Sequence, residues 1–386
     1  MEKIDNMYRN GIVKNIEISL IRQIALKMKN YSDGIDLTIG EPAQDLPESI
    51  KKEMSDRILN DKIGYTQTGG MPELKKEIVK YYNEQFESDY KIENCLITVG
   101  STEGLSTFIR YFVQEGDEVL MPTPTYPGYA PNIKMQKGKE VYIDTSKNNY
   151  KLTAEMLKAA ITPKTKALIL TYPNNPSGSV LELEEMDKIA QVIRENNIYV
   201  LSDEIYGAIA FEKYNSFARY KDLKDKIIVI NGFSKSHSMT GYRVGYMLAS
   251  EVLISDFTKL SQYTTTGVCT IGQYGAIKAL QDYPTREDII SENKKRIEYF
   301  VNGLEKLGFD VIKPEGAFYI FAGYGKLSNM NSLDFANYIV ENTHVGVVPG
   351  LCFMVDKYLR FSITKDIPDL EQALKRIEKA LKELKN

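Results

Sequence analysis

The chain has 386 residues, of which 43% are hydrophobic and 26% are charged, and its formal net charge is −3. This length allows one large and one smaller domain, and the mild acidity excludes a basic surface for nucleic acid or anionic lipid. No uninterrupted apolar run is long enough to cross a bilayer, so we expect no membrane span, and the N-terminal residues lack the pattern of a secretion signal.

In chain order, the spacing of apolar residues first predicts an amphipathic helix over residues 16–28. A long region of short strands and helices follows, with one helix over 184–195. Its strand-like runs, rich in Ile, Leu and Val, are 95–100, 117–122, 166–173, 197–204 and 226–232. The last part of the chain contains a long helix over 286–307, a closing charged helix over 368–385, and short strands around 316–321 and 358–363.

Apolar strands that alternate with helices predict an α/β fold whose mainly parallel sheet is covered by helices on both faces. We expect this large domain to span residues 46–284. A smaller α+β domain takes residues from both chain ends: 1–45 form an N-terminal arm and part of it, and 285–386 form the remainder. No linker rich in Pro, Gly or Ser separates the parts.

The cysteines and histidines limit the chemistry. Cys95, Cys269 and Cys352 are far apart and form no CxxC pair, so we expect buried thiols in a reducing compartment, the cytoplasm. His237 and His344 are too few for a His-rich metal site, and no metal is predicted. There is no G-x-S-x-G motif for a hydrolase serine, so proton transfer would fall to lysine, tyrosine or a carboxylate.

Polar motifs follow the predicted strands at the point where each strand ends. "GSTEG" follows "LITV", "NNPSG" follows "LILTYP", "DEIY" follows "IYVLS", and "SK" follows "IIVINGF". Because ligands bind at the carboxyl edge of open α/β sheets, these motifs predict one binding site.

A phosphate would suit the first of these motifs. Gly100, Ser101 and Thr102 offer free N–H groups at a predicted helix start, although an ordinary turn with a serine cap explains them equally well. Ser234 and Arg243 would add a hydroxyl and a fixed cation. The alternative for Arg243 is a surface ion pair, but its place in "MTGYRVG" favours partial burial and a ligand role. The motif matches neither GxGxxG nor the P-loop, so no nucleotide is implied.

A flat ring would suit the next group of residues. Asp203 ends a buried strand and needs a partner such as a protonated aromatic nitrogen; a helix cap or loop carboxylate is the alternative. Tyr206 lies three residues further on, and Asn175 is either a donor in a proline-rigidified turn or simply a turn residue. Tyr126 offers an aromatic face, although a core or turn role is commoner for a single tyrosine.

Two cations complete the set. Lys235 follows a β-branched run, a setting that a solvated surface lysine does not need. Arg360, in the strand "YLRFSIT", would pair with a carboxylate, either of a ligand or of a structural ion pair. Together the motifs specify a phosphate, a ring with a basic nitrogen, a lysine for an aldehyde, and a carboxylate-bearing second molecule. This describes pyridoxal 5'-phosphate (PLP) and an amino acid, with Lys235 holding the cofactor as a Schiff base and then moving the proton.

The chain resembles the PLP-dependent aminotransferases of class I, fold type I, over nearly its whole length. The motifs that carry the resemblance occur in the family's order: "LTIGEP", "YTQTGGMPELKKEI", "TVGSTEGL", "PTPTYPGY", "YPNNPSG", "LSDEIY", "SKSHSMTGYRVGY", "GAFYIF" and "LRFS". Within the family, "INGFSKSHSMTGYR", Leu120 to Tyr129 and "EISLIRQ" are most similar to the branch of N-acetyl-L,L-diaminopimelate and aspartate aminotransferases.

The resemblance implies a transaminase of amino-acid metabolism that moves an amino group between an L-amino acid and a 2-oxo acid. It implies 2-oxoglutarate as the acceptor, and N-acetyl-L,L-diaminopimelate, aspartate or an aromatic amino acid as candidate donors. The implied catalytic residues are Lys235, Asp203 and Tyr206, which also bind PLP. The further implied cofactor ligands are Gly100, Ser101, Thr102, Tyr126, Asn175, Ser234 and Arg243, with Tyr65 reaching the neighbouring active site of a homodimer. The implied substrate ligands are Gly40, Asn175 and Arg360.

The chain also departs from the family's pattern and leaves alternatives open. Gly232 stands where many relatives have Ser, and Ala43 and Gln44 replace an Asp-Phe pair near the substrate. A PLP-dependent β-lyase would share the proton-abstraction step, and release of pyruvate and ammonia without an acceptor would identify it. A non-catalytic PLP-sensing regulator would carry an extra DNA-binding domain, for which the large domain begins too early.

Overall fold

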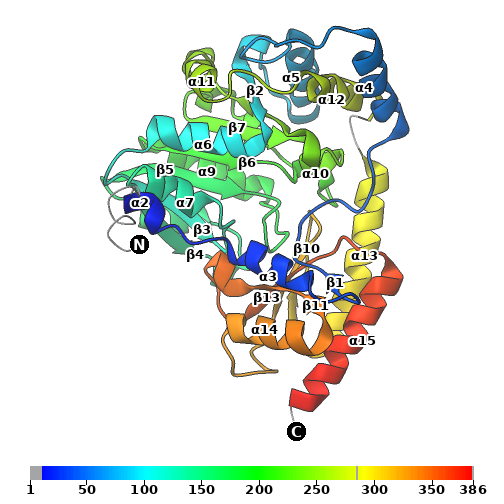
Figure 1. The fold of residues 1–386 in the computed structure, drawn as a ribbon. Coiled ribbons are helices and arrows are strands. Elements are labelled where there is room, and N and C mark those ends of the chain that lie inside the picture. The colour runs from blue at the N-terminus through cyan, green and yellow to red at the C-terminus, as the bar shows by residue number, and fades with distance from the viewer. Residues whose placement is uncertain (1–10, 284–285, 385–386) are drawn as a thin grey trace, which may run out of the picture.

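The computed structural model describes residues 11–283 and 286–384 of the chain. Its largest sheet has seven strands in the order β2–β8–β7–β6–β5–β3–β4 (Figure 1). These strands are β2 (Cys95–Val99), β3 (Glu118–Thr123), β4 (Lys139–Asp144), β5 (Thr165–Thr171), β6 (Tyr199–Asp203), β7 (Ile227–Gly232) and β8 (Val244–Leu248). Only β8 runs antiparallel to its neighbours, so the sheet is mainly parallel.

Both faces of this sheet are buried, because each central strand is apolar on both sides. In β7, Ile227 and Val229 belong to one hydrophobic core, whereas Ile228 and Ile230 belong to the core on the opposite face. This alternation follows from the two-residue period of a strand. The five predicted strands are confirmed, and β4 and β8 were not predicted. β4 is an edge strand with charged ends, and β8 is interrupted by Gly245, so neither shows a long apolar run.

Helices cover the two faces of the large sheet. α6 (Gly100–Phe112) and α11 (Glu251–Thr264) pack on one face through residues such as Phe108 and Phe257. α5 (Pro72–Phe86) and α9 (Leu183–Glu195) pack on the other, where Ile78 and Ile193 join the second core. The remaining helices of this part are α4 (Glu48–Asn60), α7 (Tyr129–Met135), α8 (Ala154–Ala160), α10 (Phe233–Ser236) and α12 (Thr270–Asp282).

The two ends of the chain together build a smaller α+β part. A four-stranded antiparallel sheet has the order β12 (Val348–Pro349), β13 (Tyr358–Ser362), β10 (Tyr319–Gly323) and β9 (Asp310–Ile312), and β1 (Ile35–Asp36) pairs in parallel with β11 (Val345–Gly346). Its helices are α3 (Leu20–Met28), α13 (Glu287–Lys306), α14 (Ser332–Thr343) and α15 (Ile367–Leu384), and α2 (Gly11–Lys14) precedes them. Figure 1 shows the N-terminal α3, in blue, against the orange and red elements of the C-terminal region. The core of this part contains Ile35 and Leu37 beside Phe300, Phe335 and Phe361.

Several expected boundaries change. The helix expected over residues 16–28 begins at Leu20, because Ser19 has a non-helical backbone and occupies the N-cap position. Of the three thiols expected to be buried, only Cys95 is; Cys352 is partly buried, and Cys269 is exposed at the N-cap position of α12. The separate cores favour the expected domains 1–45, 46–284 and 285–386, which stay a prediction; residues 1–10, the boundary between 284 and 285, and the last residue of the 368–385 helix lie outside the described residues.

Within the described residues, none of the helices has the length and apolarity needed to span a membrane. Short 3₁₀ turns complete the connections, at Ile92–Asn94, Ser146–Asn148, Gly207–Ile209, Phe217–Arg219, Lys221–Leu223, Thr240–Tyr242 and Gly350–Phe353.

Candidate active site

Strand direction brings the polar motifs to one edge of the large sheet. Asp203 is the last residue of β6, and Lys235 follows the end of β7 by three residues. Asn175 comes shortly after β5, which lies parallel to β6. β8 is antiparallel to β7, so Arg243, just before its start, lies at the edge where β2 ends and Gly100 begins α6.

The N-terminus of α6 and Arg243 form one end of the site. Gly100 has a φ of 67°, which glycine adopts without strain, and a Cβ there would collide with the guanidinium group of Arg243. Gly245 lets β8 come close, because a Cβ at this position would lie 2.5 Å from the backbone nitrogen of Ser101. The Gly100 N–H is not free as expected, because it donates to the Arg243 carbonyl oxygen at 3.0 Å. The next N–H groups, of Ser101 and Thr102, have no partner inside the helix, so a phosphate here would meet these donors and a guanidinium together.

Arg243 is exposed and not partly buried as its sequence context suggested. It follows the 3₁₀ turn Thr240–Tyr242 in a left-handed backbone conformation, which places it at the rim. Its Nη1 donates to the carbonyl oxygen of Thr240 at 3.0 Å. Ser234, in contrast, is buried behind the rim, and Ser101 and Thr102 lie in the first turn of α6.

A buried carboxylate lies at the centre of the site. Asp203 is 8% exposed, its Oδ2 accepts a hydrogen bond of 2.7 Å from the Tyr129 hydroxyl, and its Oδ1 accepts from the Ile205 N–H at 3.3 Å. Burial raises the pKa of Asp203 to about 6, and these hydrogen bonds oppose the rise. A cationic ring nitrogen would relieve the cost of burying this charge. Sequence reasoning missed Tyr129, although it stands in the quoted motif "PTPTYPGY".

Lys235 lies in the short helix α10 with its ammonium directed at the opposite wall. Its Nζ donates to the carbonyl oxygen of Gly40 at 2.6 Å. Burial lowers the pKa of Lys235 to about 8; the Glu41 carboxylate opposes this, and the guanidinium groups of Arg243 and Arg360 add to it. A lysine whose pKa lies this close to neutral pH can lose its proton, form a covalent bond to an aldehyde and exchange protons.

The second wall is built around Arg360, which is 2% exposed. Its Nη1 donates to Asn175 Oδ1 at 3.0 Å and its Nη2 donates to the Thr38 carbonyl oxygen, whereas its Nε is buried without a partner. The guanidinium group lies over the rings of Tyr319 and Phe353, with its Cζ 4.6 and 5.1 Å from their centroids. The side-chain partners of Arg360 among the described residues are the neutral oxygens of Asn175 and Thr38, so the buried cation retains N–H donors for a ligand carboxylate.

Tyrosines close the space between these groups. The Tyr206 and Tyr319 hydroxyls lie 2.8 Å apart, and burial raises the pKa of Tyr206 well above its usual value. A Cβ on Gly40 would collide with the Tyr319 hydroxyl, so only glycine fits between Tyr319 and Lys235. Tyr319 lies in the family motif "GAFYIF", but the sequence alone did not predict it as a site residue.

Tyr126 and Tyr65 are the two expected site tyrosines whose side chains are exposed. Tyr126 is 39% exposed and contacts Tyr129 edge to face, with 5.3 Å between ring centroids. Burial and the Asp203 carboxylate raise the pKa of Tyr126, whereas nearby guanidinium groups lower it, among them that of Arg22 in α3. Tyr65 is 94% exposed in the segment between α4 and α5, and this chain by itself does not bring it into the site.

These residues fit PLP. The helix N-terminus with Arg243 suits a phosphate, Asp203 suits a protonated ring nitrogen, Lys235 suits the aldehyde, and the unpaired Nε of Arg360 suits the carboxylate of a second molecule. Where the structure describes the chain, no cluster of His, Cys, Asp and Glu could hold a metal ion.

The sequence profile of the family described as aminotransferase class I and II matches residues 32–377. The chain belongs to this family. The aminotransferase is 37% identical to a probable N-acetyl-LL-diaminopimelate aminotransferase of Bacillus subtilis, over 96% of this chain and 94% of the relative. It is 35% identical to an aspartate aminotransferase of Bacillus sp. strain YM-2, over 96% of this chain and 98% of that one.

Solved structures agree with this membership. The aminotransferase superimposes on the aspartate aminotransferase of Thermus thermophilus with maleate at a TM-score of 0.92 and 27% identity, covering 96% of this chain and 99% of that one. The resemblance, the α/β fold with its smaller α+β part, the enzyme class and the dependence on PLP are thereby confirmed. These relatives are all named aminotransferases, and they give no support to a β-lyase.

Proposed function

We propose that this aminotransferase moves the amino group of an L-α-amino acid to a 2-oxo acid, with Lys235 as the cofactor anchor and proton carrier. The observation that carries the proposal is the half-buried lysine, which bonds to Gly40 and has a pKa of about 8. An ordinary lysine would be protonated at neutral pH and unable to act as a base, because its pKa is about 10.4.

Bound PLP supplies an electron-withdrawing ring that makes the α-proton of an attached amino acid acidic. Lys235 Nζ would carry this proton from the α-carbon to the aldehyde carbon of the cofactor. Asp203 would hold the proton on the ring nitrogen, and Tyr129 orients the Asp203 carboxylate through the 2.7 Å hydrogen bond to Oδ2. Tyr206 and Asn175 would donate to the phenolic oxygen of the ring.

Arg360 and Gly40 would hold the substrate α-carboxylate. Asn175 Oδ1 and the Thr38 carbonyl oxygen fix the guanidinium plane, which leaves the Nε–H and the remaining Nη hydrogens for two carboxylate oxygens. The α-carbon is then held at one place relative to Lys235, and this is what aligns the proton for transfer.

The phosphate and ring contacts complete the cofactor site. Ser101, Thr102, Ser234 and Arg243 would bind the phosphate, Gly100 would leave room for the Arg243 guanidinium group, and the Tyr126 ring would lie against the pyridine. We also propose a homodimer in which Tyr65 reaches the phosphate in the neighbouring subunit. Its 94% exposure in a single chain supports this role, because a tyrosine left in water gains nothing from its ring.

For the substrates, we propose 2-oxoglutarate as acceptor and N-acetyl-L,L-diaminopimelate or aspartate as donor. Two relatives carry these donors in their names. The second carboxylate of 2-oxoglutarate needs a second cation, and the exposed Arg22 of α3 acts electrostatically on Tyr126 at the site. The similar Thermus thermophilus enzyme was solved with maleate, which is also a dicarboxylate. The free thiols Cys95, Cys269 and Cys352 favour a cytoplasmic location.

Borohydride reduction followed by peptide mapping tests the central assignment. We expect the cofactor to be fixed on Lys235, and an adduct on another lysine would overturn every cofactor contact proposed above. Lys235→Ala should bind PLP only non-covalently and lose transamination by several orders of magnitude.

A donor screen tests the substrates. Each candidate donor is incubated with 2-oxoglutarate, and glutamate is measured. Release of pyruvate and ammonia in the absence of any 2-oxo acid would instead identify a β-lyase. Arg22→Ala should weaken 2-oxoglutarate more than pyruvate, and equal losses for both acceptors would remove Arg22 from the proposal.

A further inference from the structure

The loop before β10 connects the smaller part of the chain, through hydrogen bonds, to the turn that contains Asn175. Glu315 lies in this loop, and its backbone N–H donates to the Gly178 carbonyl oxygen at 2.9 Å. Its own carbonyl oxygen accepts from the Phe211 N–H at 2.8 Å. Glu315 therefore contacts the turn after β5 and the segment after Tyr206 through its main chain alone.

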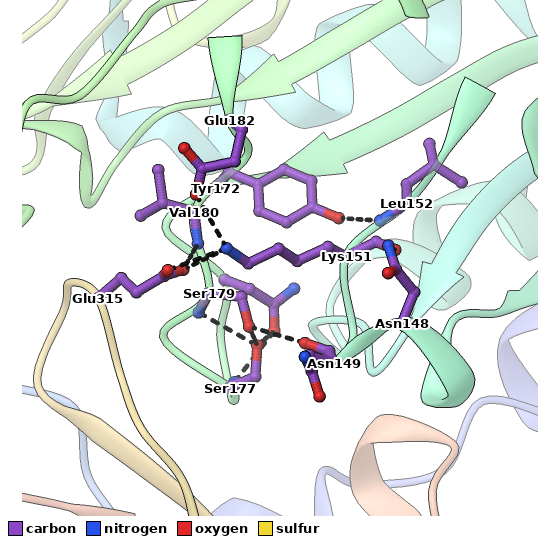
Figure 2. Close-up of polar contacts among 11 residues, drawn as sticks. Asn148, Asn149, Lys151, Leu152, Tyr172, Ser177, Ser179, Val180, Glu182 and Glu315 are labelled. Atoms are coloured by element: carbon purple, nitrogen blue, oxygen red, sulfur yellow. Dashed lines mark hydrogen bonds and ion pairs between the residues drawn. The ribbon is translucent and has the colours of Figure 1, made fainter. Parts of the chain in front are cut away.

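The side chain of Glu315 adds a third segment, as Figure 2 shows. Its Oε1 accepts a hydrogen bond of 2.9 Å from Lys151 Nζ, and its Oε2 accepts one of 2.8 Å from the Val180 backbone N–H. Lys151 also approaches the exposed Glu182, at the longer distance of 3.4 Å. The Glu315 carboxylate is thus held by one cation and one main-chain donor of the large sheet's loops.

The turn that receives Glu315 is itself closely bonded. Asn174 Oδ1 accepts from both the backbone N–H and the hydroxyl of Ser177 at 3.0 Å, and the hydroxyls of Ser177 and Ser179 lie 2.8 Å apart (Figure 2). Gly178 has a φ of 71°, and a Cβ on it would lie 2.5 Å from Cβ of Pro314. Because the turn and the loop touch without spare space, a shift of one displaces the other.

The contact between Asn175 and Arg360 joins the turn after β5 to the smaller part of the chain, which contains Arg360 in β13. Asn175 follows Asn174 in the turn and accepts from Arg360 Nη1 at 3.0 Å. Since a guanidinium group cannot accept a hydrogen bond, the Asn175 oxygen must face Arg360 and its NH₂ group must face the other way. Arg360 pairs in register with Phe321 of β10, the strand that begins four residues after Glu315.

We propose that Glu315 is a positioning residue, whose carboxylate locks the Asn174–Val180 turn to the loop before β10 and so aligns the Asn175 amide with Arg360. The inference rests on the proposed function, because it takes Asn175 as a ligand of the PLP ring oxygen. An isolated exposed ion pair would contribute little, but a carboxylate that also accepts from a backbone N–H has a fixed geometry.

Three variants separate the contributions of the Glu315 side-chain contacts. Glu315→Ala removes both side-chain contacts, and we expect KM for the amino donor to rise about 10-fold, as for the loss of one hydrogen bond to a charged group. Glu315→Gln keeps an acceptor for Val180 and should recover most of this loss. Glu182→Ala is the matched control, because it also touches Lys151 but not the turn, and its KM should equal that of the wild type.

The absorbance of the bound cofactor gives a readout that a purely structural role would not move. Loss of the Asn175 hydrogen bond destabilises the ionised ring oxygen, so the pKa obtained by titrating the cofactor's absorbance should rise in Glu315→Ala and stay unchanged in Glu182→Ala. If Glu315→Ala does not fold, Lys151→Met, which leaves the bond to Val180, should show a smaller change in the same direction, and no change would overturn the proposal.

A double-mutant cycle with Asn175→Ala decides whether Glu315 acts through Asn175. We expect Glu315→Ala to add no further change in KM or in the titration once Asn175 is alanine. Full additivity of the two variants would overturn the positioning role while leaving the proposed function intact. If Asn175→Ala alone changes neither quantity, the proposed cofactor site is wrong, and the role of Glu315 falls with it.

Discussion

Replacing Arg360 with lysine should separate substrate binding from cofactor binding. Arginine has five N–H donors, and in the structure one bonds to Asn175 Oδ1 and another to the Thr38 carbonyl oxygen, which leaves three. Lysine has three donors in all. If two of them satisfy the same oxygens, one remains for a carboxylate that Arg360 would bind with two.

The expected cost follows from this count. One lost charge-assisted hydrogen bond, together with the looser placement of the α-carbon, should lower transition-state stabilisation by about 2–4 kcal/mol. This corresponds to a fall in kcat/KM of about 30-fold to about 1,000-fold. The cofactor's absorbance should change little, because Arg360 is not expected to touch PLP. The melting temperature should also change little, because lysine keeps the charge and can satisfy the same two oxygens.

The assay compares the half-reaction of an amino donor with that of the amine that lacks its carboxylate. Arg360→Lys should slow the amino acid far more than the amine, since only the former uses the guanidinium group. If the variant sheds its cofactor or unfolds while the remaining enzyme keeps its full rate, Arg360 is a structural cation and the reasoning is refuted.

Three further predictions concern buried ionisable side chains. Asp203→Asn should keep the fold but lose the protonated ring nitrogen, so the proton-abstraction rate should fall while substrate affinity holds; unchanged single-turnover rates would contradict the role of Asp203. Because burial lowers the pKa of Lys235 to about 8, capture of PLP by the cofactor-free protein should accelerate with rising pH and level off above about 8, and a plateau only near 10.5 would argue against it. Burial lowers the pKa of His237 from 6.5 to about 4, so the unfolded state binds the proton first and stability should fall between these values as the pH falls. The free energy of unfolding, measured with urea, should fall by about 3 kcal/mol over this range and by less in His237→Gln. An equal dependence of this free energy on pH in both proteins would contradict the prediction.

Much of the fold is encoded locally. Strands such as Ile227–Gly232 are apolar on both faces, and amphipathic helices such as Leu183–Glu195 repeat their apolar residues at helical spacing, so both were predictable without tertiary information. That the polar motifs lie together also followed from the sequence, because motifs that end parallel strands must meet at one edge. Local patterns could not predict β8, whose antiparallel position between β2 and β7 depends on pairing with strands far away in the chain.

The pairing of the site's side chains was decided only by the tertiary structure. Lys235 bonds to Gly40, 195 residues away, and Arg360 bonds to Asn175, 185 residues away. The sequence indicated that Arg360 needed a partner, but not that its buried Nε would be left without one. Residue types and strand ends are properties of short segments, whereas such contacts depend on how the two parts of the chain pack. The carboxylate of Glu315 shows the same limit, because nothing around "PEGAF" indicates that it bonds to Val180.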